Sequence, residues 1–226
     1  MNSISSTKKA ISLFLKAVVI VSALSGTFIS AYSGRNSFMG GSTVFMFFTI
    51  QSNIAMAIIS AIGFNYLIKR KKPDVIWQII KYVGTVSITL TGVVFCFVLA
   101  PTLGAHAWNI HNVLTHVIVP VASIVDFFVI GELINLNKKS VIFVIIPPLL
   151  YAIYAGIGYV RGWQFVEGYN YPYFFLNWGS KAGAFGFTNE LPYMGTVWWI
   201  LALLIFLIFV GLLYLFFNDL IKKRNK

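Results

Sequence analysis

The chain has a single cysteine and very few acidic residues. One cysteine, Cys96, excludes an internal disulfide bond and every metal motif built from several cysteines, so we expect it to be a packing residue. Aspartate and glutamate number 6 in 226 residues, and charged residues of both signs make up only 10%. Because 58% of the residues are hydrophobic and the mean hydropathy is +0.83, this composition does not fit a soluble globular domain.

Long apolar runs account for nearly the whole chain. Each has at least the ~20 residues that a helix needs to cross the hydrocarbon core of a bilayer. No Gly/Ser linker, internal repeat or low-complexity segment separates them. The sequence therefore predicts an all-α fold, in which residues 1–226 form a single six-transmembrane-helix bundle. The predicted spans are at about residues 10–31, 43–68, 75–100, 108–131, 141–160 and 192–217.

The net charge of +11 is concentrated in alternate connections between the spans. Basic residues precede or enter the first span, follow the second and the fourth, and end the chain: Lys8, Lys9, Lys16; Lys69, Arg70, Lys71, Lys72; Lys138, Lys139; Lys222, Lys223, Arg224, Lys226. The other connections carry only Arg35, Arg161 and Lys181. This asymmetry predicts an N-in, C-in orientation. The charge thus indicates topology and contact with anionic lipid, and no nucleic-acid partner.

Two polar side chains in different spans are expected at one depth in the membrane. With the termini inside, the second and fourth spans both run inward from the outer surface. At ~1.5 Å per residue, Thr49 and His116 then lie roughly 10 Å below that surface. Ser52 and Asn53 follow Thr49 at helical spacing and share its face. Such polar groups also form hydrogen bonds between helices that stabilise the bundle by only about 0.6 kcal/mol each. This cluster therefore indicates a functional site only if a reactive side chain from another helix lies beside it.

His116 is a suitable partner for that cluster. It shares a stripe of the fourth span with Pro120 and Ser123, which follow it at positions i+4 and i+7. Pro120 removes a backbone donor and leaves carbonyl groups that a polar side chain or water can use, which favours a cavity there. An ionisable residue at membrane depth is a functional-site candidate, because its burial is costly without a partner or water.

Metal and haem ligation fit the histidines poorly. In a regular helix His111 lies about 140° around from His116, so the i, i+4 pair of a metal-binding helix face is absent. Haem ligation needs histidines on facing helices, yet all three lie within residues 106 to 116. We therefore predict neither metal nor cofactor. We expect His106 and His111 near the outer boundary, with His111 the better placed to contribute to a site.

Asp126 is expected to be a structural anchor. It lies about 15 Å deeper than His116 and about 80° around the helix, so it cannot orient the imidazole as the acid of a triad. We expect it to pair with Lys81 or with hydroxyl groups. The hydroxyls of "TVSITLT" in the third span are expected to serve packing, because such groups commonly bond to their own helix.

The connection between the fifth and sixth spans, "RGWQFVEGYNYPYFFLNWGSKAGAFGFTNELP", is long and aromatic. Many of its aromatic side chains suit the headgroup layer of a membrane: Trp163, Tyr169, Tyr171, Tyr173 and Trp178. The stretch "YNYPYFFL" is also apolar enough to dip back into the bundle. As a re-entrant lid over the polar layer, residues 163–178 would exclude water and admit an acyl chain sideways from the lipid.

Three short stretches occur in order along the chain: "FFTIQSN" in the second span, "LTHVIVP" in the fourth and "GWQFVEGYNYPYFFL" after the fifth. Together they resemble the androgen-induced-protein family of multi-pass membrane hydrolases and its bacterial six-span relatives. The resemblance implies an intramembrane threonine hydrolase that cleaves fatty-acid esters of hydroxy fatty acids, located in the bacterial cytoplasmic membrane. Thr49 would match the nucleophile and His116 the base. Animal members differ in the polar residues after the threonine and in the spacing from histidine to proline.

The residue chemistry fits a serine/threonine-type lipid esterase. A hydroxyl needs a neighbouring base to become a nucleophile, and an imidazole fills that role. We expect oxyanion donors from Ser52, Asn53 or a backbone N–H near Pro120. The expected partner is a membrane lipid or an acyl-chain substrate. The predicted substrate contacts are Ser52, Asn53, His111, Ser123, Trp163, Tyr171 and Tyr173.

The alternative is a small transporter, channel or lipid-binding protein in which the same polar layer lines a pathway. Asp126 and Lys81, which are charged groups within spans, motivate it. The sequence contains no evident inverted repeat or pair of broken helices, which weakens the transporter hypothesis.

Overall fold

The computed structural model describes residues 5–33 and 41–224. Arg35 and Lys226, whose charges entered the orientation argument, lie outside them. The described chain contains six helical segments that are long and apolar enough to cross a membrane, the number that the sequence predicts. This composition indicates an integral multi-pass membrane protein. The segments are Ser6–Ser33, Phe48–Ile68, Val75–Trp108, Ile110–Val129, Lys138–Val160 and Thr196–Arg224.

Several of these segments combine more than one kind of helix. The α-helices are α1 (Ser6–Ser33), α2 (Phe48–Ile68), α3 (Val75–Val94), α4 (Ala100–Leu103), α5 (Ile110–Val113), α6 (Val119–Val129), α7 (Ile146–Val160) and α8 (Thr196–Arg224). Two π-helical turns are η3 (Phe95–Leu99) and η5 (Leu114–Ile118). The 3₁₀ stretches are η2 (Thr43–Met46), η4 (Gly104–Trp108), η6 (Gly131–Leu133), η7 (Lys138–Ile145) and η8 (Phe174–Leu176).

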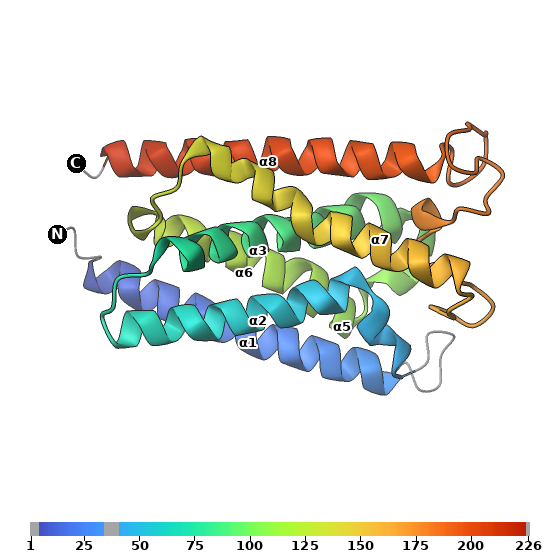
Figure 1. Ribbon diagram of the computed structural model, residues 1–226. Coiled ribbons are helices and arrows are strands. Elements are labelled where there is room, and N and C mark those ends of the chain that lie inside the picture. Colours follow the sequence, from blue (N-terminus) through green and yellow to red (C-terminus); the bar gives the residue numbers. More distant parts are fainter. Residues whose placement is uncertain (1–4, 34–40, 225–226) are drawn as a thin grey trace.

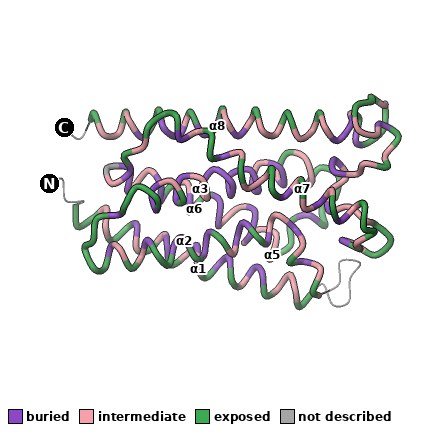
Figure 2. Tube along the Cα trace, in the orientation of Figure 1, coloured by how far each residue is buried: buried purple, intermediate pink, exposed green. Residues whose placement is uncertain are grey.

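The long helices lie side by side, with α3 and α6 in the middle of the bundle (Figure 1). α1 packs against α2 and α6, and α2 also packs against α3. On the other side, α8 runs along η7 and α3. Both described ends of the chain lie at the same end of the bundle, and the segment after α7 lies at the opposite end (Figure 1). Buried positions concentrate on the central helices, whereas most positions of α8 are intermediate or exposed (Figure 2).

The apolar core has two main parts. The larger part joins α3, α6, η7, α7 and α8 around residues such as Tyr82, Phe127 and Leu207. The smaller part joins α1, α2, α3 and α6 through Val19, Met56 and neighbouring aliphatic residues. Because α7 and α8 pack mainly through one side, they leave long apolar faces exposed, as helices in contact with lipid do.

The start of the second span differs from the predicted position. Residues 43–46 form a 3₁₀ turn and Phe47 is extended, with a ψ of 140°, so α2 begins only at Phe48. Thr49 therefore lies in the first turn of α2 rather than about six residues inside a helix. The third segment likewise continues to Trp108, and the sixth begins at Thr196 and continues to Arg224. Hydropathy predicts which stretches can lie in lipid, but it does not predict at which residue a helix begins or ends.

Short polar side chains cap the N-termini of α3 and α5, two helices near the candidate site. Asp74 precedes α3 and accepts a hydrogen bond from the backbone N–H of Trp77 at 2.7 Å. Asn109 precedes α5 and accepts one from the N–H of Asn112 at 3.0 Å. Each cap satisfies a backbone donor that the first helical turn leaves free. The Asn109 cap thereby fixes the helical turn from which the chain leads into η5.

Each π-helical turn ends two residues before a proline. η3 precedes Pro101 and η5 precedes Pro120. A proline ring clashes with the carbonyl four residues earlier and supplies no N–H, and a widened turn accommodates both effects. The fourth span is consequently not the regular helix that the angular argument for His111 and His116 assumes.

Charged groups meet inside the bundle, where α1, α3 and α6 bring them together. The carboxylate of Asp126 accepts hydrogen bonds from Lys81 at 2.6 Å, from Lys16 at 2.6 and 2.7 Å, and from Ser12 at 2.5 Å. All three charged side chains are at most 1% exposed. The predicted pairing of Asp126 with Lys81 and a hydroxyl is confirmed. Lys16, counted from the sequence among the basic residues that precede or enter the first span, is an inward part of this cluster, which joins α1 to α3 and α6.

We expect Asp126→Asn to lower the free energy of unfolding by about 3–5 kcal/mol, because it leaves two buried ammonium groups without a counter-charge. The measurement is denaturant unfolding in detergent micelles. The control is Glu190→Gln, whose partner Lys181 is 74% exposed; an exposed pair of this kind contributes about 0–1 kcal/mol. Equal effects of the two substitutions would contradict the anchoring role.

Candidate functional site

The structure brings together the alcohol and the imidazole that the sequence analysis paired. Thr49 Oγ1, in the first turn of α2, lies 3.2 Å from Nε2 of His116 in η5. The two residues are 67 positions apart in the chain. The expectation that they share one layer of the bundle is confirmed, and the distance is within hydrogen-bond reach of a hydroxyl and a base.

The hydrogen-bond partners of His116 indicate which ring nitrogen carries the hydrogen. Nδ1 lies 3.1 Å from the backbone carbonyl oxygen of Asn112 and 3.0 Å from Thr115 Oγ1. A carbonyl oxygen can only accept, so in the neutral ring the hydrogen belongs on Nδ1. Nε2 then carries its lone pair toward Thr49. Asn112 therefore holds the imidazole in this orientation through its backbone carbonyl.

The widened turn before Pro120 also positions the alcohol. In a π-helical turn the carbonyl of Thr115 would accept from the residue five positions later, which is Pro120 and has no N–H. Asn53 Nδ2 donates to this carbonyl at 3.1 Å and to the carbonyl of Thr49 at 2.8 Å. Asn53 is fully buried. The predicted use of a carbonyl near Pro120 is confirmed, and it links α2 to η5.

Two residues of the third segment complete the walls around His116. The Phe95 ring stacks on the imidazole, with ring centroids 3.8 Å apart and 20° between their planes. A Cβ at Gly92 would lie 3.0 Å from the carbonyl oxygen of His116, so a larger residue would push η5 away from α3. The Phe95 ring therefore packs on one face of the imidazole, and the close approach of α3 at Gly92 holds the backbone of His116 in place.

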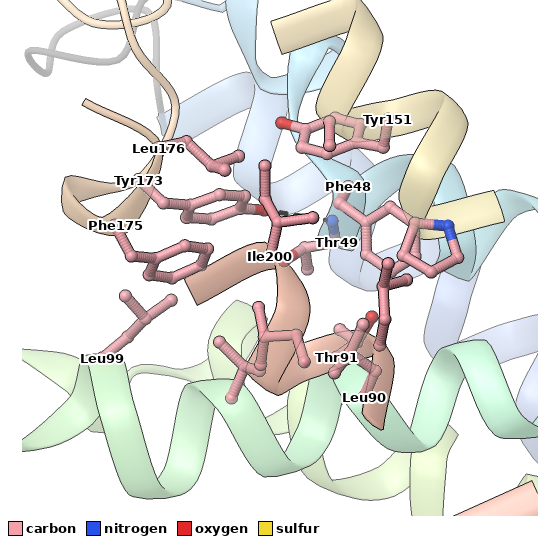
Figure 3. A pocket seen from close by; sticks show the side chains of 15 residues that line it. Phe48, Thr49, Leu90, Thr91, Leu99, Tyr151, Tyr173, Phe175, Leu176 and Ile200 are labelled. Atoms are coloured by element: carbon pink, nitrogen blue, oxygen red, sulfur yellow. Dashed lines mark hydrogen bonds between the residues drawn. The ribbon is translucent and has the colours of Figure 1, made fainter. Parts of the chain in front are cut away.

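An apolar cavity of about 60 Å³ adjoins Thr49 (Figure 3). Its walls come from α2, α3, η3, α7, α8 and the loop after α7. Hydroxyl groups provide its polar side chains, on Thr49, Thr91, Tyr151 and Tyr173. The remaining wall is aliphatic or aromatic: Phe48, Leu90, Val94, Leu99, Pro148, Ala152, Phe175, Leu176, Ile200, Leu203 and Leu204.

Tyr173 is the residue of the long loop that comes closest to the alcohol. Its hydroxyl oxygen accepts a long hydrogen bond of 3.4 Å from the backbone N–H of Thr49, marked by the dashed line in Figure 3. Its ring stacks on Phe175 at 5.1 Å and meets Phe47 edge-on. Burial raises the pKa of the Tyr173 phenol, so the group keeps its hydrogen at neutral pH.

The loop thus closes over the cavity through a shorter stretch than predicted. Tyr173, Phe175 and Leu176 line the cavity. Trp163 instead packs against Tyr154 of α7. Tyr171 pairs with Tyr169 away from the cavity wall. Of the predicted cap, residues 163–178, the stretch 173–176 contributes to the cavity wall, whereas Trp163 and Tyr171, which are predicted substrate contacts, do not line it.

The other predicted substrate contacts lie outside the cavity wall, and of their side chains those of Ser52 and Asn53 have hydrogen-bond partners. Ser52 bonds to the carbonyl of Thr49 at 3.0 Å and to Thr91 at 2.8 Å. The backbone carbonyl of His111 accepts from Thr115 at 2.8 Å. Ser123 is fully buried, and its hydroxyl has no hydrogen-bond partner among the described residues. Like Asn53, these residues support the site or lie beside it, and they do not line the cavity.

Three residues of the site were not predicted from the sequence. Asn112 precedes His116 by four residues in "HNVLTH", and this spacing could have identified it as an orienting group. Phe95 is one of 21 phenylalanines, so the sequence carries no signal for it. Thr91 was assigned to packing, yet it also lines the cavity.

The chemistry available at the site is that of hydroxyl groups and one imidazole. Within residues 5–33 and 41–224, no group of three or more His, Cys, Asp or Glu side chains is placed to hold a metal ion. Comparisons with protein-family models, with curated proteins and with solved structures find no match, so a functional assignment rests on this geometry.

Proposed function

We propose that the protein is an intramembrane hydrolase of lipid esters, with Thr49 as nucleophile and His116 as base. The observation that carries the proposal is the 3.2 Å contact between Thr49 Oγ1 and His116 Nε2 beside an apolar cavity. Orientation of the imidazole by Asn112 supports it, because a base needs its lone pair aimed at the hydroxyl. The sequence resemblance to the androgen-induced-protein family leads to the same substrate class, fatty-acid esters of hydroxy fatty acids.

In the first half of the reaction, Thr49 Oγ1 bonds to the ester carbonyl carbon while His116 Nε2 takes the hydroxyl proton. The π electrons of the carbonyl move to its oxygen and give a tetrahedral oxyanion. When the C=O bond re-forms, the bond to the alcohol breaks and the alcohol takes the proton from His116. The products are an ester of Thr49 and the free alcohol.

In the second half, water repeats these steps on the Thr49 ester. His116 takes a proton from the water as its oxygen bonds to the carbonyl carbon, and it returns that proton to Thr49 when the acid leaves. Both side chains are then restored. The Phe95 ring lies against the imidazole, where it stabilises the transient positive charge through its π face.

The cavity is suited to an acyl chain. Aliphatic and aromatic side chains form most of its wall, and α7 and α8, which contribute to it, have exposed apolar outer faces. The apolar wall fits an acyl chain, and the proposed route of entry is sideways from the lipid, past α7 or α8. We further propose the N-in, C-in orientation in the bacterial cytoplasmic membrane, which the basic loops support and which places Thr49 in the outer half of the bilayer.

Transport is the weaker proposal. Asp126 and Lys81, which motivated a transport pathway, pair with each other and with Lys16 in a buried cluster. This pairing favours an anchoring role. None of these three charged residues lines the cavity beside Thr49.

We expect Thr49→Ala to abolish hydrolysis of p-nitrophenyl octanoate by the purified protein in nanodiscs, because the nucleophile is gone. His116→Ala should lower kcat by about 10²–10⁴-fold, the usual contribution of a general base. Thr49→Ser keeps the hydroxyl and should retain measurable activity. Labelling of Thr49 by an alkyl fluorophosphonate, located by mass spectrometry, measures the nucleophile directly.

The matched controls are Thr102→Ala and His106→Ala, which make the same chemical changes at exposed positions. Thermal unfolding of every variant separates loss of chemistry from loss of fold. Hydrolysis and labelling that persist unchanged in Thr49→Ala would refute the proposed reaction.

The cavity also predicts a dependence on acyl-chain length. Ala152→Phe adds a ring to the cavity wall on α7, so we expect slower hydrolysis of octanoate and longer esters, at least tenfold relative to acetate. Ala202→Phe adds the same ring to an exposed position of α8 and serves as the control. Parallel losses for short and long esters would place the acyl chain elsewhere.

A further inference from the structure

The proposed reaction develops negative charge on the ester oxygen, and a site in a low-dielectric interior needs hydrogen-bond donors for that charge. Both side-chain donors expected from the sequence, Asn53 and Ser52, are already in use. The Asn53 amide donates to the carbonyls of Thr49 and Thr115. The hydroxyl of Ser52 is engaged with the carbonyl of Thr49 and with Thr91. The donors for the oxyanion must therefore come from another side of Thr49.

The long loop provides one on the cavity side. Tyr173 lines the cavity, and its hydroxyl points toward Thr49 in Figure 3. The 3.4 Å contact with the Thr49 N–H uses the phenol oxygen as acceptor, so the phenol keeps its hydrogen as a donor. In the absence of substrate this hydrogen has the neighbouring hydroxyl groups of Thr49 and Tyr151 as partners, and an ester oxygen beside Thr49 would take their place. At 3.4 Å this contact is long for an N–H···O bond and is replaced at small cost.

The backbone N–H of Thr49 is the second donor beside the nucleophile. It lies in the first turn of α2, where backbone N–H groups have no partner within the helix and the helix dipole favours negative charge. Thr49 thus presents both its hydroxyl and its N–H on the side of Tyr173. A nucleophile whose own N–H serves the oxyanion also occurs in serine hydrolases.

We propose that the Tyr173 hydroxyl and the Thr49 N–H together form the oxyanion hole, with the phenol delivered by the loop that closes the cavity. The inference rests on the proposed hydrolase function and names a further catalytic residue for it. When Thr49 Oγ1 bonds to the carbonyl carbon, the electron pair that moves to oxygen is stabilised by these two donors. The Tyr173 proton is shared by hydrogen bonding and is not transferred.

The packing of Tyr173 makes the donor rigid. Its ring lies between the stacked Phe175 ring and the edge of Phe47, which directly precedes α2. Tyr151 of α7, whose hydroxyl donates to the carbonyl of Met46 at 3.1 Å, lies beside it. Preorganised donors stabilise a developing charge without reorganisation during the reaction. The donor therefore belongs to the same stretch, residues 173–176, that lines the cavity.

The test is Tyr173→Phe in the full-length protein in nanodiscs, with Tyr169→Phe as the matched control in an exposed part of the same loop. We expect kcat for p-nitrophenyl octanoate to fall about 10²–10³-fold, with KM changed less than threefold, as for loss of one oxyanion donor. A second measurement compares an octyl trifluoromethyl ketone, which adds to Thr49 Oγ1 and forms an oxyanion, with the corresponding secondary alcohol, which cannot. Tyr173→Phe should weaken binding of the ketone about 10²-fold and leave alcohol binding unchanged.

Each outcome decides the proposal. Wild-type kcat in Tyr173→Phe, or equal weakening of ketone and alcohol, would mean that the ring only packs the cavity and would overturn the oxyanion role. If Thr49→Ala abolishes activity while Tyr173→Phe does not, the hydrolase stands and the oxyanion assignment fails. If both variants remain fully active, the hydrolase itself fails. Thermal unfolding of Tyr173→Phe within a few degrees of the wild type establishes that the comparison concerns a folded protein.

Discussion

The hydrogen bond from Asn53 to the backbone carbonyl of Thr115 joins the two parts of the chain on which the candidate site depends. It exists because Pro120 supplies no N–H, and a carbonyl left unpaired in an apolar interior is costly. The same amide binds the carbonyl of Thr49. One side chain therefore fixes the first turn of α2 against the widened turn that carries His116, and the distance between alcohol and imidazole follows from this bridge.

A second set of polar contacts holds the bundle together at another level. Lys16, Lys81 and Asp126 join α1, α3 and α6, and the aliphatic cluster around Val19 and Met56 packs among α1, α2, α3 and α6. In the ion cluster opposite charges satisfy one another. In the site the groups are neutral hydroxyls, amides and an imidazole. The charged groups are thus separate from the candidate site. They anchor the helices, whereas the neutral groups of the site are the ones that would exchange protons in the proposed reaction.

The sequence is informative where a rule of periodicity or depth applies. Hydropathy predicts six spans, and counting residues from the outer surface places Thr49 and His116 in one layer, which their contact confirms. Asp126 is correctly paired with Lys81, because a buried charge requires a partner. Lys16 was counted with the basic residues that precede or enter the first span, because a charge count does not show which way a side chain within the span points. Choosing Tyr173 over Tyr171 depends on the path of an irregular loop, which local sequence does not determine.

In the proposed reaction, the cavity wall constrains which ester can react. The fifteen residues that line it in the described chain include four hydroxyl groups and no charged side chain. A carboxylate or phosphate inside it would lose its hydration without gaining a counter-charge, a cost that its neutral hydroxyl groups cannot offset. A neutral acyl chain meets no such penalty. The geometry therefore favours an ester whose acyl part enters the cavity while any charged part stays outside, so that the scissile bond lies at Thr49, where the apolar cavity meets the polar layer.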